Sequence, residues 1–162
     1  MKPLVGAFLI FTIASPAYAD WEGIDWGMTD AQVEAADTEV QVYRLEEVKR
    51  KRVRPVTSTL GGKWTRDGQD YQLYFYFGTE GKLQFIDVEP VGVDCAGMND
   101  LLADQFGDFE EEIDKLGPAT RTVRHWSLKR TVELNSLVLH FPGDNSWSCN
   151  AVIRNPAPWL AR

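Results

Sequence analysis

The sequence predicts an α+β fold, in which an antiparallel sheet is covered on one face by short helices. Segments 71–77 and 83–88 are dense in β-forming residues, and three similar segments follow between residues 120 and 153. Apolar residues at helical spacing are confined to 30–36 and 97–116. Strands joined by short turns pair antiparallel, which leaves the helices to cover one face of the sheet.

The first 19 residues predict a secretory signal peptide. Lys2 supplies a positive charge, residues 4–14 are apolar, and Ala17-Tyr18-Ala19 is a small-x-small cleavage site before Asp20. The apolar stretch is too short to span a bilayer as a helix, and Asp20 in place of a cysteine argues against a bacterial lipid anchor. We therefore expect a periplasmic or secreted protein, cleaved after Ala19 and without stable membrane insertion.

The mature chain, residues 20–162, has the length of a single domain. Removal of 19 residues from 162 leaves 143, enough to bury a core. Loss of Lys2 lowers the basic count from 17 to 16 against 24 acidic residues, so the net charge is −8. Such a charge disfavours non-specific binding to nucleic acid, so no nucleic-acid partner is expected.

Two cysteines, Cys95 and Cys149, are expected to form a disulfide, since an exported chain meets an oxidising compartment. Addition of His125 and His140 would make a Cys2His2 metal set, but the close ligand pairs of zinc sites are missing. A redox role is disfavoured by the absence of a Cys-x-x-Cys motif. We expect neither a metal nor another cofactor.

The N-terminal elements begin with a short helix, 30–36, for which Thr29 is a good N-cap. An extended stretch is expected around 40–45. The basic run from Lys49 to Arg54 permits two interpretations: a contact with an anionic partner, or an exposed edge whose charges block strand pairing. The edge interpretation is favoured because no aromatic residue interrupts the run.

A β-hairpin follows, formed by 71–77 and 83–88 around the turn 79–82. Gly61-Gly62 and Asp67-Gly68 are predicted turns. The helix 97–116 is expected to be kinked or divided at Gly107 and stopped by Gly117-Pro118. The later strands are expected at 120–127, 131–141 and 147–153.

A short recurrence suggests a duplication. Gly27-Met28-Thr29-Asp30 returns as Gly97-Met98-Asn99-Asp100, with three of four residues identical, at the start of each predicted helix. The chain would then consist of tandem helix-then-sheet units, 20–94 and 95–162, sharing one curved sheet. Chance identity is the alternative.

The helix start Gly27 to Val33 and the helix exit Leu116-Gly117-Pro118 resemble two groups of small secreted bacterial modules. These are the β-lactamase-inhibitor-protein type and the SmpA/OmlA outer-membrane-assembly lipoproteins. Their exit is similar to Leu-Gly-x-Pro, whereas here the proline follows the glycine directly, and the lipoprotein cysteine is missing. The resemblance implies an α+β layer and a protein-binding role, and no binding residue carries over.

No catalytic residue is expected, and the chain is predicted not to be an enzyme. Neither His125 nor His140 lies near a serine in a nucleophile elbow, and phosphate-binding, dinucleotide-binding and zinc-protease motifs are absent. The six tryptophans and the tyrosines of 71–77 either form a binding platform or fill the core. Trp26, Trp126 and Trp147 are expected in the core.

The candidate binding residues are Tyr74 and Tyr76. They share a strand face with Gln72, which marks that face as the wetter one, so both tyrosines are expected to be accessible. The alternative is that a second layer or the C-terminal tail, with Trp159-Leu160, covers them. The leading hypothesis is a non-enzymatic, exported protein- or peptide-binding module. The alternative is a protein that binds cell-wall glycan or a small ligand through its Trp/Tyr surface, and a third hypothesis is a hydrolase with an unrecognised site.

Overall fold

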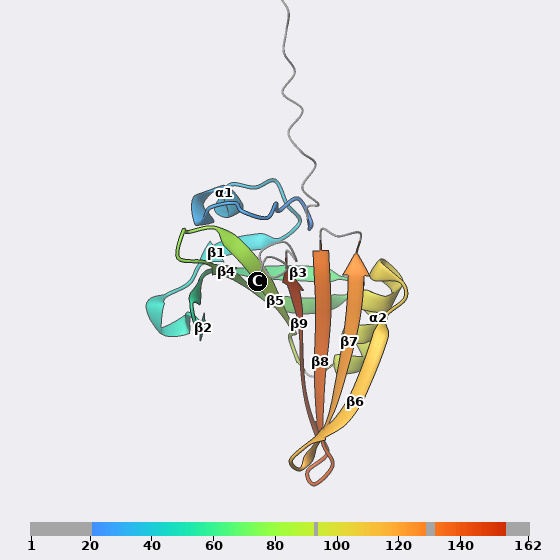
Figure 1. Cartoon of the computed structure of the whole chain (residues 1–162). Coiled ribbons are helices and arrows are strands. Elements are labelled where there is room, and N and C mark those ends of the chain that lie inside the picture. Colours follow the sequence, from blue (N-terminus) through green and yellow to red (C-terminus); the bar gives the residue numbers. More distant parts are fainter. Residues whose placement is uncertain (1–20, 93, 129–131, 155–162) are drawn as a thin grey trace, which may run out of the picture.

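The structure is a computed structural model that describes residues 21–92, 94–128 and 132–154 (Figure 1). The predicted signal peptide and the C-terminal Trp159-Leu160 lie outside the described residues. The fold is mainly β, so the predicted α+β class is wrong. Only one described helix, α2, is longer than a turn or two, which is too little to cover the sheet face.

The elements of the first half are α1, Asp30–Glu34; β1, Gln41–Arg44; η1, Glu47–Lys49; β2, Arg52–Val53; β3, Val56–Arg66; β4, Gln69–Phe77; and β5, Leu83–Pro90. Those of the second half are α2, Cys95–Phe106; β6, Glu110–Leu116; β7, Ala119–Leu128; β8, Val132–Phe141; and β9, Ser146–Arg154. The later strands thus lie where the sequence predicts them.

All strands join one antiparallel sheet in the order β1-β3-β4-β5-β9-β8-β7-β6, with β2 paired to β3. The last strands of the two halves, β5 and β9, meet at its centre, where Phe85–Val88 pair with residues 151–154. The sheet is strongly twisted: β3 and β4 run across Figure 1, whereas β7 and β8 run down it. Each half is a helix followed by a meander, the arrangement expected of two tandem units; the duplication itself stays a prediction.

Helix α1 begins where the sequence predicts it. The Gln32 amide donates to Thr29 Oγ1 at 3.3 Å, and the Thr29 amide donates to Gln32 Oε1 at 2.9 Å. This capping box satisfies amides that the first helical turn leaves without partners. The helix ends at Glu34, two residues before the predicted end.

The predicted helix 97–116 is half wrong. Helix α2 stops at Phe106 because Gly107 takes a φ of +78°, which L-residues with side chains rarely adopt. Residues 110–116 then form β6, held to β7 by cross-strand ion pairs between Glu111 and Arg124 and between Asp114 and Arg121. These non-local pairs outweigh the helical spacing of apolar residues in this segment.

The Gly61-Gly62 pair lies inside β3, so the predicted turn there is wrong. A Cβ on Gly61 would come within 2.9 Å of the Tyr43 ring, and one on Gly62 within 2.7 Å of Val40. The glycines therefore permit close packing of β1 and the segment before it on β3. The second turn is confirmed: Asp67 and Gly68, both at positive φ, join β3 directly to β4.

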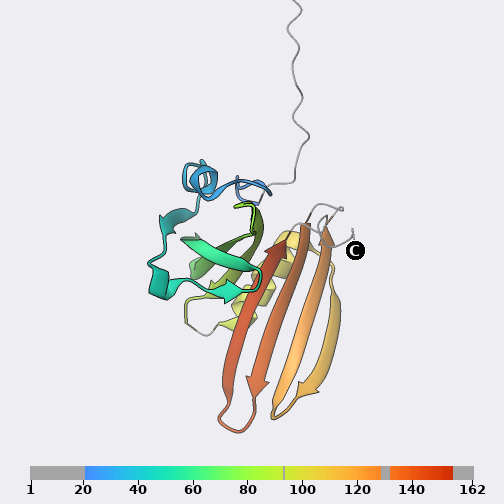
Figure 2. The same ribbon diagram turned by 60° about the vertical axis from the view of Figure 1, so that its left-hand side comes forward.

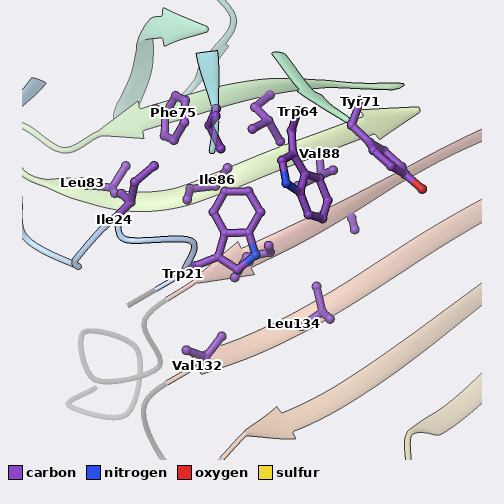
Figure 3. Packing of buried hydrophobic residues seen from close by; sticks show 14 of the residues in the cluster. Trp21, Ile24, Trp64, Tyr71, Phe75, Leu83, Ile86, Val88, Val132 and Leu134 are labelled. Atoms are coloured by element: carbon purple, nitrogen blue, oxygen red, sulfur yellow. The ribbon is translucent and has the colours of Figure 1, made fainter. Parts of the chain in front are cut away.

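The core lies on one face of the sheet. Side chains from both halves meet there with the N-terminal segment (Figure 3). Met98 and Leu102 of α2 belong to the same cluster. Its largest members include Trp21, Ile24, Trp26, Trp64, Tyr71, Leu73, Phe75, Ile86, Met98, Leu102, Trp126, Leu134 and Ile153. Burial of Trp26 and Trp126 is thereby confirmed.

Candidate functional site

Neither α1 nor α2 packs on the opposite face of the sheet, although the segment between η1 and β2 places Lys51 over its first half. Directly paired residues share a face, so the strand register defines one row across the sheet. The row is Tyr43, Gly61, Tyr74, Asp87, Val152, Asn135, His125 and Glu110. We call this surface the helix-free face; in Figure 2, α2 lies behind β9, so the face of the second half is turned to the viewer.

The two candidate tyrosines differ in accessibility. Tyr74 is half-buried on the helix-free face, and the Lys51 ammonium lies 3.8 Å from the centre of its ring. Tyr76 is only 2% exposed, so the expectation that it is accessible is wrong. Phe85 on β5 stacks on its ring with centroids 4.2 Å apart, and burial raises the pKa of the Tyr76 hydroxyl.

The basic run contributes Lys51 to a charge cluster on this face. The Lys51 ammonium pairs with Glu89 and lies 3.9 Å from Asp87, and Asn150 donates to the Asp87 carboxylate at 2.7 Å. Other cations of the run pair locally: Lys49 with Glu46, and Arg52 with Glu47. This pairing, together with the attachment of β2 to β3, favours the edge interpretation of the run.

Asp87 gives a pH-dependent prediction. Burial raises the pKa of this carboxyl group, and Glu89 raises it further, against the hydrogen bond from Asn150 and the charge of Lys51. The folded chain therefore holds the proton more tightly than the unfolded chain. Protonation of Asp87 thus stabilises the folded chain relative to the unfolded chain. This stabilisation is fully present below the ordinary aspartate pKa and is lost as pH rises through the raised pKa of the folded chain. Asp87→Asn, which cannot ionise, should gain stability relative to wild type as pH rises from about 3 to 7, measured by urea unfolding.

Asp114→Asn is the matched control, with the opposite sign. The hydrogen bond from Arg121 lowers the pKa of Asp114, so its ionised form favours the folded chain. This variant should lose stability relative to wild type over the same rise in pH, by a small amount because the group is exposed. If the stability of both variants relative to wild type changed in the same direction with pH, the raised pKa assigned to Asp87 would be wrong.

A second polar cluster continues the row across β8 and β7. Arg154 pairs with Glu133 and lowers the pKa of that carboxyl group. Asn135 donates to Glu133 at 3.3 Å, and its amide oxygen lies 2.5 Å from His125 Nδ1. His125 thus belongs to a structural network, without a contact to a nucleophilic side chain among the described residues.

Beyond these clusters the helix-free face is more apolar. The register of β7 and β8 places Val123 opposite Leu137, and Leu139 opposite Arg121. The three apolar side chains are half-exposed, and Leu116 at the end of β6 is exposed. Arg121 is paired with Asp114, which neutralises the charge within this strip.

A hollow of about 430 Å³ lies on the core side of the sheet, beside α2. We call it the α2 hollow; its lining is Asp94, Cys95, Ala96, Asn99, Asp100, Thr122, Arg124, Val138 and Trp147. Trp147 is 45% exposed, so its predicted burial is wrong. Its ring stacks on His140, with centroids 4.0 Å apart, near the end of the β8–β9 hairpin and away from the core.

The α2 hollow has a covalent anchor. Cys95, the first residue of α2, is bonded to Cys149 of β9, with their Cα atoms 5.7 Å apart, as expected for the cysteine pair. The bond fixes the start of the helix on the sheet. The two cysteines in the sequence predict the disulfide, but no sequence pattern predicts the hollow beside it.

No family model matches the chain, and neither a curated protein nor a solved structure is significantly similar to it. The resemblance to the inhibitor-protein and lipoprotein modules therefore stays a prediction. Within 21–92, 94–128 and 132–154, neither α-helix has the length and hydropathy needed to cross a bilayer. In the same part of the chain, no three potential ligand side chains are grouped to hold a metal ion.

Proposed function

We propose that this is an exported, non-enzymatic protein that binds another protein or a peptide through the helix-free face. The observation that carries the proposal is a sheet with one face packed by the N-terminal segment and α2, and the other left uncovered by the described elements across β7 and β8, where Val123, Leu137 and Leu139 are partly exposed. Uncovered apolar area of this kind marks interaction surfaces.

The chemistry of the face suits a protein partner. Its charges are mostly arranged in pairs, such as Lys51 with Glu89, Arg154 with Glu133, and Arg121 with Asp114. A partner can cover such pairs without leaving one charge unmatched, whereas a lone buried charge is strongly unfavourable. Apolar side chains interspersed with satisfied polar groups are typical of protein interfaces.

The strip of Val123, Leu137 and Leu139 is the expected centre of the interface. These side chains come from neighbouring strands and are held by the sheet, so little conformational entropy is lost when a partner packs on them. Tyr74 adds a half-buried ring at the other end of the face, fixed beneath Lys51. The predicted signal peptide and the disulfide support a site of action outside the cytoplasm.

Paired substitution of Leu137 and Leu139 by serine tests the proposal. The exported wild-type protein serves as bait for a periplasmic extract, and captured partners are identified by mass spectrometry and their affinity is measured. We expect the double variant to bind the identified partner at least about tenfold more weakly, since central apolar contacts dominate interface energies. Thermal unfolding checks that the variant remains folded.

Val91→Ser is the matched control, because Val91 is an exposed apolar residue away from this strip. It should bind the partner as the wild type does. Equal capture by the double variant and the control would place the interface elsewhere. Capture of glycan fragments without any protein would count against a protein-binding role.

A further inference from the structure

The α2 hollow combines an apolar wall with an exposed aromatic ring. Val138, Ala96 and the disulfide partner Cys95 supply the wall, and Trp147 lies at the exposed end of β9. The indole ring is held in place by His140, which stacks on it at an interplanar angle of 15°. A volume of about 430 Å³ falls within the range of small-ligand sites.

Several polar groups of the hollow lack partners within the described chain. Asn99 is only 8% exposed, and its amide oxygen accepts a hydrogen bond from Ser136 Oγ at 3.0 Å. Its amide nitrogen is left without a partner among the described residues, as are the side chains of Asp100 and Thr122. These groups reach the hollow with hydrogen-bonding capacity to spare, so they can bind a polar ligand that enters it.

The remaining polar groups are partly engaged. Asp94 accepts a hydrogen bond from the Gly97 amide at 2.8 Å and caps the helix. Arg124 donates to Glu111 at 2.8 Å, and its guanidinium lies 4.6 Å from the centre of the Phe109 ring. The hollow therefore offers both donors and acceptors, without a single dominant charge.

We propose that the α2 hollow binds a neutral sugar ring of a glycan. A sugar hydroxyl both donates and accepts, so it can satisfy the Asn99 amide, the Thr122 hydroxyl and the Asp100 carboxylate together. The C–H face of the ring packs on Trp147, since an indole face is negatively polarised. A cationic peptide side chain would use the carboxylates only and would face the Arg124 guanidinium.

This site is distinct from the proposed protein interface. Arg124, Thr122 and Trp147 lie on the core side of the sheet, opposite the helix-free face. Loss of the protein partner and loss of glycan binding are therefore separate results, obtained with separate variants.

The test is a titration of the mature, oxidised chain with the trimer of N-acetylglucosamine and with cellotriose, followed by NMR. We expect saturable shifts of the Trp147 indole N–H and the Asn99 side-chain amide with at least one trisaccharide. Trp147→Ala and Asp100→Asn should each weaken binding by about tenfold or more, the latter by removing a charged hydrogen bond. A response to one sugar alone would show whether the acetamido group is needed.

Asp104→Asn is the matched control, because Asp104 lies on the same helix but lines a neighbouring hollow with Arg66 and Asp67. It should leave the affinity unchanged. The proposal is overturned if neither trisaccharide gives saturable shifts, or if Asp100→Asn binds like the control. It is also overturned if trilysine shifts the same signals and the sugars do not.

Discussion

Removal of the Cys95–Cys149 disulfide is expected to lower the free energy of unfolding by about 4 kcal/mol. The cysteines are 54 residues apart, so the cross-link restricts a long loop of the unfolded chain. In the native chain it ties the first residue of α2 to β9. Urea unfolding of Cys95→Ala/Cys149→Ala against wild type measures the loss.

Wild-type protein unfolded in the presence of a reductant is the control, and it should match the double variant. Mass spectrometry of the exported protein without reduction checks the premise: the chain should begin at Asp20 and lack the two thiol hydrogens. Equal stability of the oxidised wild type and the variant would mean that the disulfide constrains a part of the chain that is ordered even after unfolding.

The sequence predicts the strands well where β-forming residues are bounded by turn residues. The turn at Asp67-Gly68 and the hairpin of β4 and β5 join strands that are adjacent in the sequence, so local sequence patterns are enough to predict them. Segment 110–116 shows the limit. Its apolar residues at helical spacing predict a helix, but the Arg121 and Arg124 partners that make it a strand come from β7.

Burial of aromatic residues depended on the same non-local information. Alternation along β4 correctly separates Tyr74 from the core residues, but the stacking of Phe85 on Tyr76 follows from the pairing of β4 with β5. Tryptophan is a typical core residue, yet Trp147 lies towards the outer end of β9. Its exposure follows from the position of α2, whose first residue, Cys95, is bonded to Cys149, so that the helix begins inward of Trp147 along β9.

The α2 hollow was not predictable for a related reason. Its lining comes from the start of one helix and from three strands that lie up to about 50 residues further along the chain. The sequence contains the signals of its parts: a cysteine pair, a helix cap and an aromatic residue after a turn. Their meeting point depends on the sheet order, which places β9 at the centre beside β5.

Trp126→Ala is expected to lower the free energy of unfolding by about 4 to 5 kcal/mol, at the upper end of the range for large-to-small substitutions in a core. The side chain is fully buried, with 0% exposed, and it packs against Phe109 with ring centroids 5.1 Å apart. Its indole N–H also donates to the Gly107 carbonyl at 3.0 Å, just after the end of α2. The substitution therefore leaves both a cavity and a carbonyl group without its partner.

Two variants separate these contributions. Trp126→Phe keeps most of the ring volume and loses the hydrogen bond, so it should cost about 1 to 3 kcal/mol, part of it from the smaller ring. Trp147→Ala, which removes the half-exposed indole, should cost less than about 1 kcal/mol. Chemical denaturation of all three variants gives the comparison. If Trp126→Ala were as stable as Trp147→Ala, the packing of α2 and β7 around this indole would be wrong, because no relaxation of a well-packed core fills a cavity of that size without loss.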